Sequence, residues 1–111
     1  MRNLQTGAVL ATSALHATGF FERMRGLLGR APLQPGQGMV IEPCNSVHTW
    51  FMGYALDLLF LDRDRRVLRV IPALPPWRMS PIVRGAHSVI ELPADASLGT
   101  LAGHPLALEP Q

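Results

Sequence analysis

The chain has 111 residues, of which 48% are apolar, and it contains one cysteine. These values predict a single domain (residues 1–111) with one hydrophobic core, and they exclude a disordered chain and an internal disulfide. Ten arginines and eight acids are mixed along the sequence, with no lysine, and this even mixture argues against a nucleic-acid-binding face.

The N-terminal segment is predicted to form a strand rather than a signal sequence. Residues 8–17 are mostly apolar, but Thr12, Ser13 and His16 interrupt the run, so residues 7–15 fit an opening β-strand. No segment approaches the roughly eighteen unbroken apolar residues that a membrane-spanning helix needs. We therefore expect a soluble, cytoplasmic protein without a membrane span, with association with the cell envelope as the alternative.

A short amphipathic helix is predicted to follow. Apolar side chains recur at the spacing of one helical face, an acid lies in the first turn, where the helix dipole favours it, and a glycine ends the pattern. The apolar positions are Phe20, Phe21, Met24, Leu27 and Leu28, with Glu22 in the first turn and Gly29 at the end.

The most apolar and aromatic part of the chain, residues 44–62, is expected to form the centre of the core. A strand at residues 39–42 precedes it, and strands are predicted at residues 47–52 and 56–61. Both faces of the first of these two are largely apolar, which indicates a strand covered on both sides. Asp57 interrupts the second, and a carboxylate there is rarely buried unless it is paired or accepts hydrogen bonds.

The C-terminal half is predicted to contain further short strands separated by turns. The charged residues 62–66 fit a hairpin turn, and residues 72–81, with four prolines, fit a long ordered loop pinned by Trp77. The other predicted elements are strands at residues 67–71, 83–92 and 105–109 and a helical turn at residues 94–101. The predicted fold is therefore α+β and predominantly antiparallel β: a compact sandwich or barrel-like sheet with one short amphipathic helix packed on it.

The order of these segments resembles a small bacterial and archaeal family, the domain-of-unknown-function family 192. The resemblance covers nearly the whole chain and implies a compact, mainly β fold with no established activity. The matching segments are residues 22–28, 38–41, 47–52, 56–62, 67–70, 75–78 and 88–93.

Three positions depart from the pattern of that family. Ala55 stands where the family usually has proline, Arg65 where it has a hairpin glycine, and residues 102–104 where it has a proline-glycine-aspartate turn. The glycine is expected to take a positive φ, so the backbone of the turn is expected to be strained at Arg65. His104 removes the acidic group from the third position.

Cys44 and His48 are candidates for metal binding or for a nucleophile and its base. Four residues of a strand span roughly 13 Å, so neither this pair nor His87 and Glu91 converge on one ion unless the backbone turns. We therefore expect no metal and no cofactor. A thiol-dependent enzyme or hydrolase using Cys44 and His48 is the alternative function, with Asp57 or Glu91 orienting the imidazole ring.

The leading hypothesis is a non-enzymatic binding or accessory module with a small cleft between residues 44–52 and 72–81. A small molecule or a peptide would be the ligand, and Arg78 and Arg84 would favour an anionic one. The oligomeric state stays open. The candidate ligand-binding residues are Arg25, His48, Asp57, Trp77, Arg78 and Glu91.

Two alternative interpretations require no ligand. Arg25 and Asp57 can form an ion pair that fixes the predicted helix to the sheet. The resemblance also allows a structural role in an envelope or pilus-type assembly.

Overall fold

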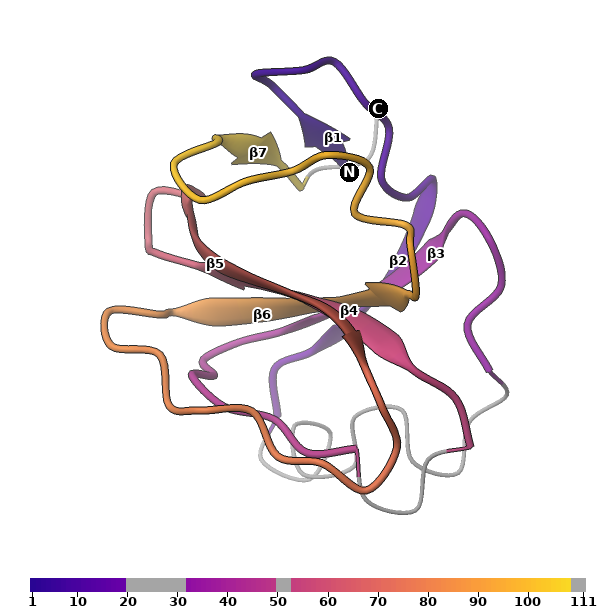
Figure 1. Cartoon of the computed structure of the whole chain (residues 1–111). Helices are drawn as coiled ribbons and strands as arrows, with labels where there is room; N and C mark the ends of the chain where they lie inside the picture. The colour runs from indigo at the N-terminus through magenta and orange to yellow at the C-terminus, as the bar shows by residue number, and fades with distance from the viewer. Residues whose placement is uncertain (20–31, 50–52, 109–111) are drawn as a thin grey trace.

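The computed structural model describes residues 1–19, 32–49 and 53–108, and these residues form only β-strands, turns and loops (Figure 1). The α+β prediction is therefore wrong for the described part of the chain, which is all-β. The predicted helix at residues 20–28 lies outside the described residues. The predicted helical turn at residues 94–101 is a series of turns, because Asp95, Leu98 and Gly99 have positive φ values of 70°, 48° and 75°.

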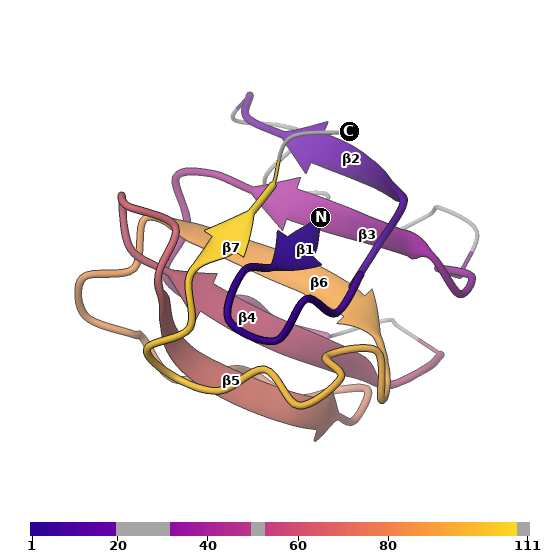
Figure 2. The same ribbon diagram turned by 90° about the horizontal axis from the view of Figure 1, so that it is seen from above.

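The strands form two sheets. The larger sheet has the order β2-β3-β6-β4-β5, in which β2 and β3 are parallel and the other neighbours antiparallel. β1 and β7 pair antiparallel and lie over one face of the larger sheet (Figure 2). The strands are β1 (Arg2–Asn3), β2 (Ser13–Ala17), β3 (Gln37–Ile41), β4 (Leu56–Leu61), β5 (Val67–Leu74), β6 (Ser88–Pro93) and β7 (Leu106–Ala107).

The core lies on both faces of strands β3, β6 and β4. All six residues of β4 are buried, so the strand predicted at residues 56–61 is covered on both sides, with Asp57 included. On the face toward β1 and β7 the buried cluster includes Val40, Leu59, Leu61, Ile90, Leu92 and Leu106, and on the other face it includes Met39, Ile41, Leu56, Leu58, Phe60, Val83 and Val89. Aliphatic side chains at both parities of these strands produce the two clusters.

Several strand boundaries differ from the predicted ones for identifiable reasons. The opening strand begins only at Ser13, because Gly7 has a φ of 79° and the chain turns before it joins the sheet. Strand β5 continues through Pro72 to Leu74. Proline is tolerated there because β5 is an edge strand, where a backbone N–H is not needed by a second neighbour.

The region predicted as a strand at residues 47–52 is described only as far as Thr49. Its described part forms one isolated antiparallel bridge, between His48 and Met79, instead of a continuous ladder. Strand β6 begins at Ser88, five residues after the predicted start, and β7 contains only two residues.

Asn3 joins the N-terminal hairpin to the turns after β6. Its side-chain amide donates to Thr100 Oγ1 at 3.0 Å and to His104 Nδ1 at 3.1 Å, and its Oδ1 accepts from the backbone N–H groups of Gln5 and Thr6. His104 Nδ1 also accepts from the Leu101 N–H at 3.2 Å. The imidazole nitrogen of His104 is therefore the shared acceptor that holds the N-terminal segment against this turn.

The hairpin turn between β4 and β5 confirms the conformation expected at Arg65. Asp62 Oδ1 accepts from the backbone N–H groups of Asp64 and Arg66, both at 2.9 Å, and Arg65 has a φ of 64°. The Arg65 guanidinium donates to the Glu42 carboxylate at 2.9 Å. This ion pair offsets part of the cost of a left-handed conformation at a residue with a Cβ atom.

We predict that Arg65→Gly is more stable than Arg65→Ala by about 1 kcal/mol, because glycine takes a positive φ without strain and both variants lose the same ion pair. Urea unfolding followed by circular dichroism measures the difference. Equal stabilities of the two variants would show that the turn is unstrained at this position.

Candidate functional site

The most unusual polar group of the larger sheet is Glu91, in the middle of the central strand β6. It stands between Met39 of β3 and Leu58 of β4, and its side chain shares their face, which is otherwise apolar. Glu91 is 4% exposed, and its Oε1 accepts no hydrogen bond from the residues that the structure describes. Burial raises the pKa of Glu91 to about 7, so the carboxyl is about half protonated at neutral pH.

Tyr54 is the second polar group associated with this face. It packs against the same apolar cluster, and its hydroxyl is buried. Burial raises the pKa of Tyr54, the nearby Glu91 carboxylate raises it further, and the Leu33 backbone opposes both effects. Nothing in the sequence singled out Tyr54, because a lone tyrosine beside a glycine is typical of a turn.

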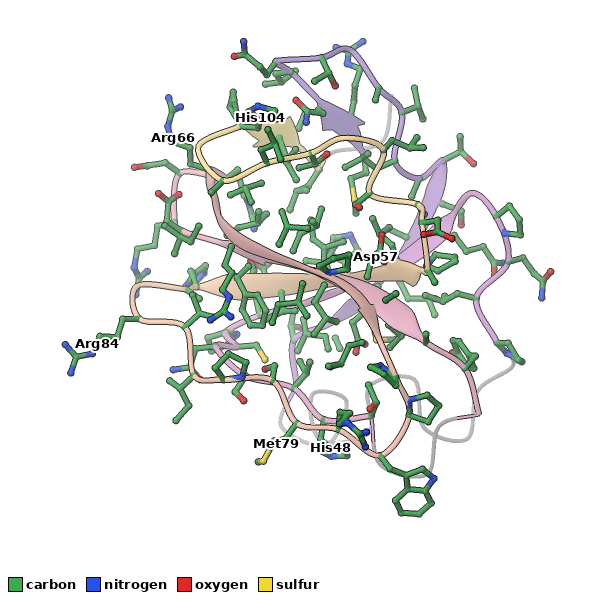
Figure 3. All side chains as sticks on the ribbon, in the orientation of Figure 1. His48, Asp57, Arg66, Met79, Arg84 and His104 are labelled. Carbon is green, nitrogen blue, oxygen red and sulfur yellow. The ribbon has the colours of Figure 1, made fainter. Side chains whose placement is uncertain are left out.

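Asp57 lies on the opposite face from Glu91. Its register partner is Leu92, which belongs to the cluster under β1 and β7, and Figure 3 shows Asp57 on that side of the sheet. Asp57 is fully buried, and its two oxygens accept from the Ala73 N–H at 2.8 Å and from the Ser97 N–H at 3.1 Å. The carboxylate therefore joins the end of β5 to the turns after β6, and it cannot line one cleft with Glu91.

Two segments that cover the Glu91 face are bonded directly to each other. The Thr49 N–H donates to the Arg78 carbonyl at 2.8 Å, the Ser80 N–H to the Val47 carbonyl at 2.8 Å, and the Val83 N–H to the Asn45 carbonyl at 2.9 Å. We call residues 44–49 and 75–83 the cover. The described parts of the two segments are therefore joined directly at the place where the sequence predicts a small cleft between residues 44–52 and 72–81.

Side chains of Thr49 and Ser80 fix the geometry of the cover. Thr49 Oγ1 donates to the Pro75 carbonyl at 2.6 Å and accepts from the Arg78 N–H at 2.9 Å, and Ser80 Oγ accepts from the Val47 N–H at 3.0 Å. Both residues are buried. The proline-rich loop is thus held by Thr49, whereas Trp77, expected to pin it, is 57% exposed. Sequence reasoning missed Thr49 and Ser80 because small hydroxyl side chains produce no periodic pattern in a sequence.

Large apolar and cationic side chains are displayed along the outside of the cover. Met79 is 63% and Ile82 72% exposed, and Arg78 and Arg84 are exposed on the same segment. His48 is also exposed and lies beside Met79, while Arg84 points away from the molecule (Figure 3). We call this the 77–84 surface, formed by Trp77, Arg78, Met79, Ile82 and Arg84 with His48 at its border.

The remaining candidate residues have local roles or lie outside the described residues. Cys44 is half-buried, and its thiol donates a hydrogen bond to the Ser46 carbonyl at 3.1 Å. His87 Nε2 lies 3.7 Å from Glu42 Oε2. The described residues contain no group of three His, Cys, Asp or Glu side chains arranged to hold a metal ion. Arg25 lies outside the described residues.

No helix in the described residues is long and apolar enough to cross a membrane.

Comparisons with known proteins identify the fold and a family. A model of the family DUF192, described as "Uncharacterized ACR", matches residues 2–106. A comparison with curated proteins found no match.

Two solved structures share the fold. A protein of unknown function from Novosphingobium aromaticivorans is 23% identical, with a TM-score of 0.75 over 83% of this chain and 71% of that one. A putative transcription regulator from Sinorhizobium meliloti is 24% identical, with a TM-score of 0.73 over 85% of this chain and 79% of that one. At this level of identity the likeness establishes the architecture alone.

Proposed function

Because the chain belongs to the DUF192 family, which is described as uncharacterized, we propose its function from its own surface: a non-enzymatic module that binds an acidic peptide segment of a partner protein. The observation that carries this proposal is the 77–84 surface, where three large apolar side chains are between 57% and 72% exposed. Tryptophan, methionine and arginine are enriched at protein interfaces, and tryptophan and arginine are frequent hot spots.

The charge of the surface supports an acidic ligand. Arg78 and Arg84 are exposed cations on the segment that carries Trp77, Met79 and Ile82. Acidic side chains of a partner would pair with the two guanidinium groups while an apolar side chain covers the indole ring. An exposed surface also suits a peptide better than a small molecule, which usually occupies a concave site.

The backbone of the surface is preorganised. The Trp77 N–H donates to the Thr49 carbonyl at 2.9 Å, and Trp77 has a φ of 62°, so its main chain is fixed in a left-handed conformation. Thr49 and Ser80 anchor the same segment from within. A rigid display of large side chains reduces the ordering cost of binding.

The thiol-dependent alternative receives less support. A catalytic cysteine needs an accessible thiolate, whereas the Cys44 thiol is half-buried and donates its proton to a backbone carbonyl. A nucleic-acid ligand is also disfavoured, since the ten arginines and eight acids leave a net charge of only +2.

Selection from a displayed random-peptide library against the purified chain tests the proposal. We expect the selected peptides to combine Asp or Glu with at least one large apolar residue. Fluorescence polarisation with the best synthetic peptide should show that Trp77→Ala and Arg84→Glu each weaken binding about tenfold or more. Circular dichroism confirms that the variants fold.

Matched controls come from the other end of the molecule and from the hairpin turn. Leu101→Ala removes an apolar side chain that is 62% exposed, and Arg63→Glu reverses an exposed charge, so both should bind the peptide within about twofold of the parent chain. Peptide affinity that is unchanged in both Trp77→Ala and Arg84→Glu refutes the proposal. So does binding only to phosphatidylglycerol vesicles, which would assign the surface to a membrane.

A further inference from the structure

The cover has an inner side as well as an outer one, and the inner side packs on the face that contains Glu91. Val83 belongs to the buried cluster of this face, and Cys44, Val47 and Tyr54 pack against it. Met39 and Leu58, the register neighbours of Glu91, are members of the same cluster. The cover therefore closes an apolar layer over a carboxyl group.

We propose that Glu91 is a proton-operated switch beneath the cover, which stays closed while the Glu91 carboxyl is protonated and opens more often when it is ionised. A neutral carboxyl tolerates an apolar layer, whereas a carboxylate with a buried oxygen that accepts no hydrogen bond favours contact with water. Opening the cover supplies that contact. Tyr54 packs against the same apolar cluster, and because burial raises the pKa of its hydroxyl, it stays neutral through this pH range and leaves Glu91 as the titrating group.

The other described ionisable groups around this face lie toward solvent or bond to other residues. On the elements packed against this face they are Cys44, His48, Arg69, Arg78, Arg84 and His87. Arg69 is exposed on the edge strand β5, with β4 between it and β6. His48, Arg78 and Arg84 are exposed on the outside of the cover, Cys44 donates to Ser46, and His87 lies near Glu42.

A consequence for partner binding rests on the proposed function. Because the 77–84 surface is the outside of the cover, opening would disturb the geometry of Trp77 and weaken peptide binding as the pH rises above neutrality. The switch itself is measured without any peptide, so failure of the switch and failure of the proposed function are separate results.

Hydrogen exchange followed by NMR at pH 6 and pH 8 tests the switch. After correction for intrinsic rates, the amides of Val47, Thr49 and Ser80 should open about tenfold more at pH 8, the factor that linkage gives for a carboxyl whose pKa falls from about 7 in the closed state to 4.5 in water. The reference amides are those of Leu106 and Gly103, which bond to the backbone of Arg65 and Val67 on the opposite side.

Two variants show which carboxyl group causes the pH dependence of the opening of the cover. Glu91→Gln should make the opening of the cover independent of pH, whereas Glu42→Gln, which alters a carboxyl paired with Arg65, should keep the tenfold response. An unchanged response in Glu91→Gln overturns the proposal, as does a cover that opens equally at both pH values. Equal acceleration of the reference amides also overturns it, since that result means global unfolding.

Discussion

Replacing Asp57 by alanine is expected to lower the free energy of unfolding by about 3–5 kcal/mol, because a fully buried side chain loses two charge-assisted hydrogen bonds and two backbone N–H groups lose their acceptor. Asp57 is fully buried, and its oxygens accept from Ala73 at 2.8 Å and Ser97 at 3.1 Å. Ala73 has a φ of 48°, so the carboxylate also holds a left-handed residue at the end of β5. Urea unfolding followed by circular dichroism measures the loss.

Two further substitutions separate this account from a general effect of removing an acid. Asp57→Asn keeps the shape and one acceptor oxygen, so its loss should be about half as large, roughly 2 kcal/mol. Asp64→Ala alters an exposed acid in the hairpin turn and should change stability by no more than about 0.5 kcal/mol. A loss below about 1 kcal/mol for Asp57→Ala would mean that neither hydrogen bond contributes as described.

The second large effect concerns Glu91 and depends on pH. The pKa of Glu91 is raised to about 7 in the folded chain from 4.5, so the folded state binds a proton more tightly than the unfolded state. Between these two values, stability must fall as the pH rises, and above about 7 it stays constant. This group alone should remove about 2–3 kcal/mol of stability between pH 5 and pH 8.

Glu91→Gln removes this titration and should be more stable than the parent chain at pH 8 by roughly 2 kcal/mol, because a neutral amide replaces a buried carboxylate. Urea unfolding at pH 5, 7 and 8 tests the sign as well as the size. A parent chain that gains stability from pH 5 to pH 8 relative to Glu91→Gln would contradict the account, since it would require a favourable partner for the ionised carboxyl.

The sequence alone predicted the buried strand at residues 56–61, the turn at residues 62–66 and the family. These features have strong local signals: an unbroken apolar run, a charged hairpin and an ordered set of short motifs. The positive φ of Arg65 was expected from the resemblance, because the related family has a glycine at this position. The buried strand and the turn have local signals, so no tertiary information was needed for them.

The sequence could not place Asp57 and Glu91 on opposite faces. Both residues interrupt strands whose remaining central positions are all apolar. Neither the alternation of side chains nor hydrophobicity therefore tells the two faces of the sheet apart. Only the register of β4 and β6, in which Leu58 stands opposite Glu91, fixes the answer. Whether the two acids can line one cleft depends on contacts between residues distant in sequence, and alternation patterns do not encode such contacts.

The cover shows a similar limit. Its two segments are joined by Thr49 and Ser80, whose hydroxyl groups bond to backbone atoms about thirty residues away. Prolines in residues 72–81 correctly indicated an irregular loop beyond Leu74, but not which residue would hold it. As a result, Trp77 was expected to be an anchor, and its exposure became informative only in the folded chain.

NMR chemical-shift mapping with the selected acidic peptide tests the central claim most directly. The account predicts that amide shifts change at residues 77–84 and at His48, and that the same peptide leaves the spectrum of Trp77→Ala nearly unperturbed. Shifts that concentrate instead around β1 and β7, or that persist unchanged in Trp77→Ala, would show that the 77–84 surface is not where this protein binds its partner.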